Sequence, residues 1–115
     1  MDTLPLIAPL IGALKEHHPG ADIASIERAF HVAEKAHEGQ LRKSGEDYIT
    51  HPVAVTQILA ELGLNEVSLI ASLLHDTVED TPYSLDQLRI DFGDEVASLV
   101  DGVTKLDKLN FGIAM

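Results

Sequence analysis

The sequence predicts a small all-α domain, and three observations support this fold class. Apolar residues recur at three- and four-residue spacing in six segments, as on one face of a helix, and no segment shows the alternation of a half-buried strand. Gly, Pro and helix-capping residues separate these segments. The chain has 115 residues and a hydrophobic content of 45%, which suits one domain with its own core.

The first helix is expected over residues 4–16, where leucine and isoleucine recur on one side. The His17-His18-Pro19-Gly20 segment ends it. Paired histidines can indicate a metal site. We favour the alternative of a polar helix end, where histidine interacts well with the helix dipole.

A second helix is expected to begin after Asp22, a good N-cap residue, and to stop at Gly39. His31 and His37 lie in or beside it. We interpret them as core or surface histidines rather than ligands.

The loop from Gly39 to Thr50 has no periodicity and is long for a helix connection, which favours a functional loop. Arg42 and Lys43 are two of the eight basic residues of the chain. A planar guanidinium and an ammonium group both suit a phosphorylated or aromatic ligand. A solvated loop with incidental charges explains the same residues equally well.

The third helix is expected to start with Pro52, because proline is favoured at the first helical position, and to end at Gly63. This would hold His51 just outside the helix N-terminus in an extended conformation. Asn65 is the expected N-cap of the fourth helix. That helix is apolar over most of its surface between Val67 and Leu74, as central buried helices are.

Two further helices complete the prediction. Ser84 and Gln87 form a capping box for a short helix that runs to about Asp91. Asp94 is the expected cap of a last helix, whose apolar repeat continues to Leu106.

The charge balance restricts the partners of the protein. Nineteen acidic residues against eight basic ones give a net charge of −11, which argues against binding to nucleic acids and to anionic membranes. A small anionic substrate stays possible, because a bound divalent cation can outweigh the net charge locally. Cysteine is absent and no targeting segment is visible, so we expect a soluble, cytoplasmic protein.

The segment from His75 to Asp80 carries four ionisable side chains at the end of the fourth helix. If the helix continues through it, Glu79 lies on the same face as His75 and Asp76. Three carboxylates at the negative end of a helix dipole are unfavourable unless a cation is bound. Two imidazoles and a carboxylate, from His51, His75 and Asp76, would suit a transition-metal ion.

Such a metal ion could activate a water molecule, and Glu79 and Asp80 could then handle the proton of that water or of the leaving group. The alternative is structural. A His-Asp dipeptide is common, and a histidine four residues before a glutamate is usually a surface ion pair.

Taken together, these motifs resemble the hydrolase domain of the RelA/SpoT homologues, which are enzymes of guanosine tetra- and pentaphosphate metabolism with an HD-superfamily helical fold. The resemblance covers about residues 22–108. The matching motifs are RKSGEDYITHP at 42–52, HDTVEDT at 75–81, FG at 92–93 and DGVTKL at 101–106.

The resemblance implies the metal-dependent hydrolysis of ppGpp to GDP and pyrophosphate, and of pppGpp to GTP and pyrophosphate. It makes His51, His75 and Asp76 ligands of a manganese ion. It gives Glu79 and Asp80 the acid–base or water-activating work beside the 3′-pyrophosphate.

The same resemblance implies that Arg42, Lys43 and Ser44 hold the guanosine, with Arg42 stacked on the base. It implies that Tyr48 supports this loop and that Lys105 lies near the phosphates.

One departure from the family pattern concerns the fourth metal ligand. In the family it is an aspartate in a Leu-Ala-Asp-Arg-type helix after the last matching motif, and these 115 residues do not include it. The last five residues are also mainly apolar and carry no capping signal. We therefore expect residues 1–115 to be a C-terminally incomplete HD hydrolase domain.

Two other functions are compatible with the sequence. The domain could hydrolyse another nucleotide. It could also be a non-catalytic regulatory or oligomerisation module, because an apolar chain end favours association.

Overall fold

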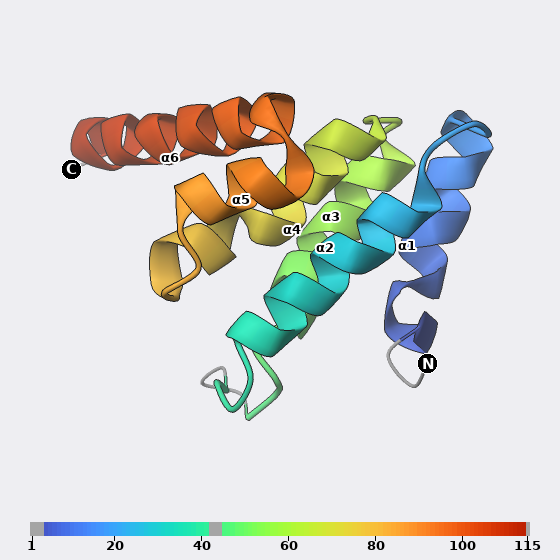
Figure 1. Cartoon of the computed structure of the whole chain (residues 1–115), viewed down its shortest axis with the longest axis horizontal. Helices are drawn as coiled ribbons and strands as arrows, with labels where there is room; N and C mark the ends of the chain where they lie inside the picture. The colour runs from blue at the N-terminus through green and yellow to red at the C-terminus, as the bar shows by residue number, and fades with distance from the viewer. Residues whose placement is uncertain (1–3, 42–44, 115) are drawn as a thin grey trace.

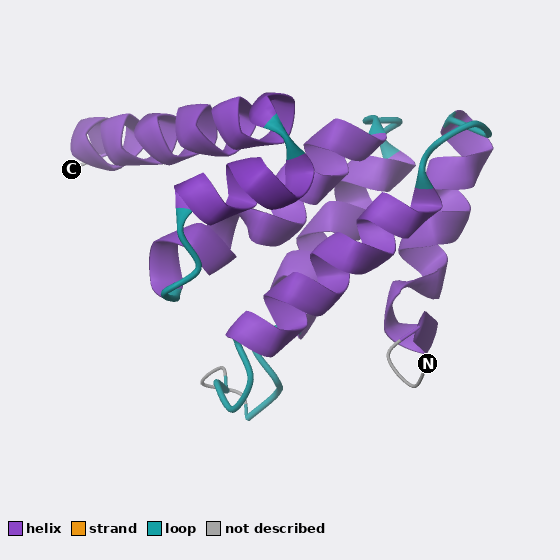
Figure 2. Ribbon diagram, viewed as in Figure 1, coloured by secondary structure: helices purple, strands orange, loops and turns teal. Residues whose placement is uncertain are grey.

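The computed structural model describes residues 4–41 and 45–114, with side chains over 6–41 and 45–105. This part of the chain folds into six α-helices without a β-strand, which confirms the all-α prediction (Figures 1 and 2). The helices are α1 (Leu4–His17), α2 (Ile23–Ala36), α3 (Thr50–Glu61), α4 (Glu66–Asp80), α5 (Leu85–Phe92) and α6 (Asp94–Ala114).

Helix α4 lies at the centre of the arrangement. It packs against α2, α3 and α6, while α1 packs mainly on α3 and α5 packs on α6. In Figure 1, α1 (blue) and α6 (red) lie on opposite sides of the molecule. Leu69, Leu73 and Leu74 of α4 are fully buried, as the nearly continuous apolar run of this helix predicts.

Three helix starts agree with the capping residues in the sequence. The side chain of Asp22 accepts a hydrogen bond from the backbone N–H of Ser25 at the start of α2. Asn65 and Ser84 make the equivalent bonds for α4 and α5, each to the N–H three residues later. Each bond satisfies a backbone donor that has no partner within the helix.

The paired histidines at the end of α1 connect it to α3. The Nε2 atoms of His17 and His18 lie 3.1 Å from the carbonyl oxygen of Glu61 and 2.8 Å from that of Gly63. A ring N–H in these positions donates to carbonyls at the C-terminal end of α3 that the helix leaves without a partner. The structure therefore favours the helix-end interpretation of this pair over a metal site.

The start of α3 differs from the prediction. The helix begins at Thr50, so His51 lies inside its first turn and Pro52 is the third helical residue. A turn in which the N–H of Thr50 donates to the carbonyl of Asp47 leads directly into the helix. Proline is tolerated there because the first N–H groups of a helix have no intrahelical acceptor.

The start of α6 also differs, because Asp94 lies within the helix rather than capping it from outside. The carbonyl of Gly93 accepts the N–H of Ala97, so Gly93 takes the N-cap position with a φ of 99°. None of the helices within the described residues combines the length and the apolar composition that a membrane span requires.

Candidate functional site

The end of α4 gathers the ionisable residues that the sequence singles out. The helix continues to Asp80, with Thr81 as its C-cap. His75, Asp76 and Glu79 each offer one ligand atom within 4.8 Å of the other two. The Nδ1 atom of His75 lies 3.4 Å from Oδ1 of Asp76, and its Nε2 atom contacts Oε2 of Glu79.

The electrostatics of this group favour a cation. Its three side chains are partly buried, with exposed fractions of 18% for His75, 26% for Asp76 and 33% for Glu79, so water screens their charges only in part. They stand at the negative end of the α4 dipole, and the last turn of α4 has no basic residue. One nitrogen and two carboxylate oxygens suit a divalent ion such as Mn, Fe or Zn.

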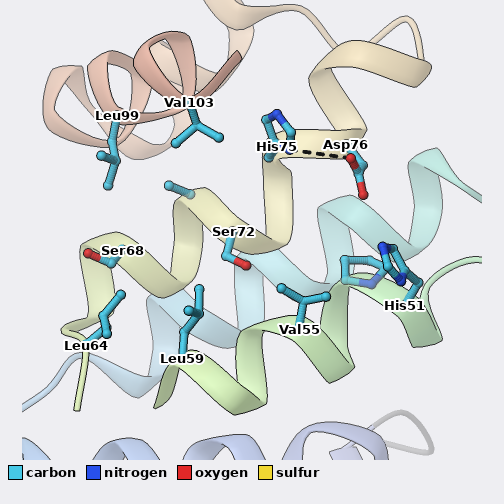
Figure 3. Close-up of a pocket in the computed structure, with 12 residues that line it drawn as sticks. His51, Val55, Leu59, Leu64, Ser68, Ser72, His75, Asp76, Leu99 and Val103 are labelled. Carbon is cyan, nitrogen blue, oxygen red and sulfur yellow. Dashed lines mark ion pairs between the residues drawn. The ribbon is translucent and has the colours of Figure 1, made fainter. Parts of the chain in front are cut away.

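His51 faces this group from α3. It lines a cavity of about 470 Å³ together with His75 and Asp76. Figure 3 shows the Asp76 carboxylate pointing towards the helix that carries His51. The structure thus brings the three predicted metal ligands to one cavity. Among the described residues, however, the group at mutual ligand distance contains Glu79 in place of His51.

The rest of this cavity is apolar, which sequence reasoning did not predict. Its wall comes from three helices and the turn between α3 and α4, with Val55, Leu59, Leu64, Leu99 and Val103 as the large apolar residues (Figure 3). Ser68 and Ser72 add hydroxyl groups. Val55 and Leu99 are partly exposed in the structure, and no pattern in the sequence marks them as residues of a cavity wall.

Tyr48 contacts site residues on both α3 and α4. Its hydroxyl donates a hydrogen bond to Oδ2 of Asp80 over 3.4 Å, and its ring meets the ring of His51 edge-on, with 6.2 Å between centroids. Burial, followed by the negative charges of Asp76 and Asp80, raises the pKa of Tyr48 to about 12. The hydroxyl is therefore a stable donor to Asp80 at neutral pH.

The predicted nucleotide-binding residues are only partly placed. Arg42, Lys43 and Ser44 lie outside the described residues. The loop that carries them is closed at its base by an isolated antiparallel bridge between Leu41 and Asp47.

Lys105, on α6, is 75% exposed and forms an ion pair with Asp101 over 3.1 Å. It is not among the residues that line the cavity. The structure therefore does not bring this residue to the cavity, and its predicted contact with the phosphates stays a prediction.

A helical domain with an adjacent His and Asp at the end of a central helix is the arrangement of an HD domain. A sequence profile described as "HD domain" matches residues 29–112, so the chain belongs to the HD-domain family.

Similar proteins show to which group of HD-domain proteins the chain belongs. It is 56% identical over 110 residues to a probable GTP pyrophosphokinase of Mycobacterium leprae. It is 60% identical over 80 residues to a guanosine-3′,5′-bis(diphosphate) 3′-pyrophosphohydrolase of Haemophilus influenzae. It is 52% identical over 98 residues to the bifunctional (p)ppGpp synthase/hydrolase SpoT of Escherichia coli. The chain is a member of the RelA/SpoT homologue family.

These matches cover 96%, 70% and 85% of the chain, respectively. They cover only 14%, 12% and 14% of the three relatives. The chain therefore corresponds to one segment of much longer proteins.

Proposed function

We propose that this domain hydrolyses the 3′-pyrophosphate of guanosine tetra- and pentaphosphate, giving pyrophosphate with GDP or GTP. The observation that carries the proposal is the close group of His75, Asp76 and Glu79, which lies next to Asp80 on α4. The Haemophilus influenzae relative is named as a 3′-pyrophosphohydrolase and the Escherichia coli relative as a (p)ppGpp synthase/hydrolase, which supports the proposal. A substrate of this kind also favours a cytoplasmic protein.

The donor set fits a divalent metal ion, and we propose manganese. His75 and Asp76 would hold it with His51, and the aspartate that the family resemblance implies would complete the set. A bound ion of this kind polarises a phosphoryl oxygen and lowers the pKa of a water molecule.

The protein groups that move protons are Glu79 and Asp80. A carboxylate accepts a proton from the attacking water, and a protonated carboxyl can return it to the leaving oxygen of the ribose. The Tyr48 hydroxyl fixes the direction of one Asp80 oxygen, because it donates to Oδ2. Glu79 is the carboxylate nearer to the metal ligands, since it contacts His75.

We propose that the 39–50 loop recognises the nucleotide. We propose that Arg42 stacks on the guanine base and that Lys43 and Ser44 bind the nucleotide beside it. Lys105 would have to leave its ion pair with Asp101 to reach a phosphate group. Such an exposed pair contributes little to stability, so the exchange costs little.

A second candidate is an HD domain without hydrolytic activity. The name of the Mycobacterium leprae relative, a probable GTP pyrophosphokinase, favours it, because that protein shares this segment at 56% identity without a hydrolase in its name.

The first test measures metal binding. Manganese should raise the melting temperature of the 115-residue chain, because a ligand that binds only the folded state stabilises it by mass action. At 100 times the dissociation constant the gain is about 2.7 kcal/mol, or about 10 °C or more for a domain of this size. His75→Ala should lose the shift. His31→Ala, which removes a half-exposed histidine of α2, is the matched control and should keep it.

The second test measures pyrophosphate release from ppGpp in the presence of manganese. It uses this chain and a version extended through the Leu-Ala-Asp-Arg-type helix. We expect release by the extended version and its loss in His75→Ala. If the extended protein releases no pyrophosphate, or if His75→Ala is as active as the unchanged protein, the hydrolase proposal is wrong and the non-catalytic candidate takes its place.

A further inference from the structure

His37 is a buried histidine that the proposed chemistry does not use. Only 3% of the residue is exposed, and it follows α2 as its C-cap, with its N–H bonded to the carbonyl of Ala33. Its ring lies where the end of α2, the base of the 39–50 loop and the last turn of α4 meet, because its contacts come from all three. The sequence predicts a core or surface histidine here, and the structure confirms the core position.

Both ring nitrogens of His37 have hydrogen-bond partners. Nδ1 lies 3.2 Å from the amide oxygen of Gln40, and Nε2 lies 3.3 Å from the hydroxyl of Thr77. Because an amide oxygen can only accept, Nδ1 carries the proton and donates it to Gln40. Nε2 then accepts from the Thr77 hydroxyl. The ring is fixed in orientation by the loop on one side and by α4 on the other.

The face of the His37 ring supports Tyr48. The two rings are stacked, with 4.5 Å between centroids and 24° between planes. The backbone N–H of Tyr48 donates to the carbonyl of Gln40 over 3.0 Å, which joins the tyrosine to the same support. The place of the Tyr48 ring is therefore set by His37 and by the residue that His37 binds.

Tyr48 transmits this position to the functional site. Its hydroxyl bonds to Asp80, and its ring edge meets His51. His37 itself contacts neither residue in any of these interactions. The ring of Tyr48 separates it from Asp80, a proposed proton-transfer group, and from His51, a proposed metal ligand.

We propose that His37 is a positioning residue, which acts through the stacked ring of Tyr48 to hold the Asp80 carboxylate and the base of the nucleotide loop in place. This inference rests on the proposed function, which it deepens. The stacked ring provides the positioning, and the hydrogen bonds to Gln40 and Thr77 hold that ring. The two contributions can therefore be separated by mutation.

The test compares His37→Ala with His37→Phe. Alanine removes the stacked face, whereas phenylalanine keeps an aromatic ring and loses both hydrogen bonds. Both variants should melt at a lower temperature, because the buried Thr77 hydroxyl loses its acceptor. His31→Ala, an exposed histidine on the same helix, is the control and should behave like the unchanged chain.

The first readout does not depend on activity. In the unchanged chain, nuclear Overhauser contacts should join the ring protons of Tyr48 to the side chains of Asp80 and His51. We expect these contacts to vanish in His37→Ala and to persist in His37→Phe. Their persistence in His37→Ala, or their loss in both variants, would overturn the inference.

The second readout is the kinetics of pyrophosphate release by the manganese-loaded version extended through the Leu-Ala-Asp-Arg-type helix, with and without each substitution. His37→Ala should lower kcat about 10- to 100-fold with a smaller change in KM, as expected when a reacting group is misplaced by a fraction of an ångström to an ångström. His37→Phe should recover most of this loss despite its lower melting temperature. A merely structural role predicts the opposite, that activity falls with melting temperature in both variants.

The two proposals fail in different ways. If the version extended through the Leu-Ala-Asp-Arg-type helix releases no pyrophosphate, the proposed function is wrong, and the contacts of Tyr48 alone decide the role of His37. If the extended version is active and its His37→Ala variant has the same kcat, the hydrolase assignment stands and the positioning role is wrong.

Discussion

Replacing Thr77 with valine would remove one hydroxyl group from the centre of the fold while keeping the branched shape of the side chain. Thr77 is fully buried in α4, and its hydroxyl is bonded to Nε2 of His37 over 3.3 Å. His37 is itself only 3% exposed, so its nitrogen would lose its partner without access to water. Leaving a buried acceptor unsatisfied costs about 1–3 kcal/mol.

Thr56 provides a matched comparison, because it is also fully buried on a helix. Its hydroxyl bonds to that of Ser72 over 2.7 Å. Ser72, however, lines the open cavity, and water can replace the lost partner. Thr56→Val should therefore cost only the net value of a hydrogen bond, about 0.5–1.5 kcal/mol.

The two variants are compared by urea unfolding, followed by far-ultraviolet circular dichroism. Thr77→Val should be the less stable by about 1 kcal/mol, which corresponds to a difference in melting temperature of about 4–8 °C. Equal stabilities, or a larger loss in Thr56→Val, would refute the reasoning that access to water decides the cost.

Three further predictions concern the helices and the core. Leu73→Ala should cost about 2–5 kcal/mol in urea unfolding, because it opens a cavity at a fully buried position of α4, and a loss below about 1 kcal/mol would contradict this packing. Ser84→Ala should cost about 1 kcal/mol, since the cap to the Gln87 N–H is lost, and an unchanged unfolding midpoint would show that the cap is dispensable. Hydrogen bonds from Ser25 lower the pKa of Asp22 in the folded protein. The stability that the ionised Asp22 contributes is therefore present above the pKa of Asp22 in the unfolded chain, and it is lost as the pH falls through the pKa of Asp22 in the folded protein. Asp22→Asn should therefore flatten the decline in melting temperature below about pH 4, and an unchanged decline would exclude this contribution.

Local signals in the sequence predicted much of the helical structure. The caps at Asp22, Asn65 and Ser84 need only a side chain and an N–H three residues later, so the fold hardly alters them. The predicted start of α3 at Pro52 was wrong, because proline is compatible with several positions in the first helical turn. A turn from Asp47, which the sequence does not signal, decided between them.

The candidate site was predictable only where its residues are close in the sequence. His75, Asp76 and Glu79 share a helix face by spacing alone, and the structure brings them together. The contact of His37 with Thr77 spans 40 residues, and the apolar cavity wall comes from three helices. Such contacts depend on how the helices pack, and one sequence carries no periodic signal for them.

The central position of α4 has a consequence for the order in which parts of the molecule open. This helix is enclosed by α2, α3 and α6, so its backbone amide protons should exchange with solvent only when the whole domain unfolds. His75 and Asp76 lie on this most protected segment, whereas the 39–50 loop is attached at the periphery, beyond the end of α2 (Figure 1). Amide exchange should therefore be slow at the metal-binding candidates of α4 and faster at the described residues of the loop that we propose to bind the nucleotide.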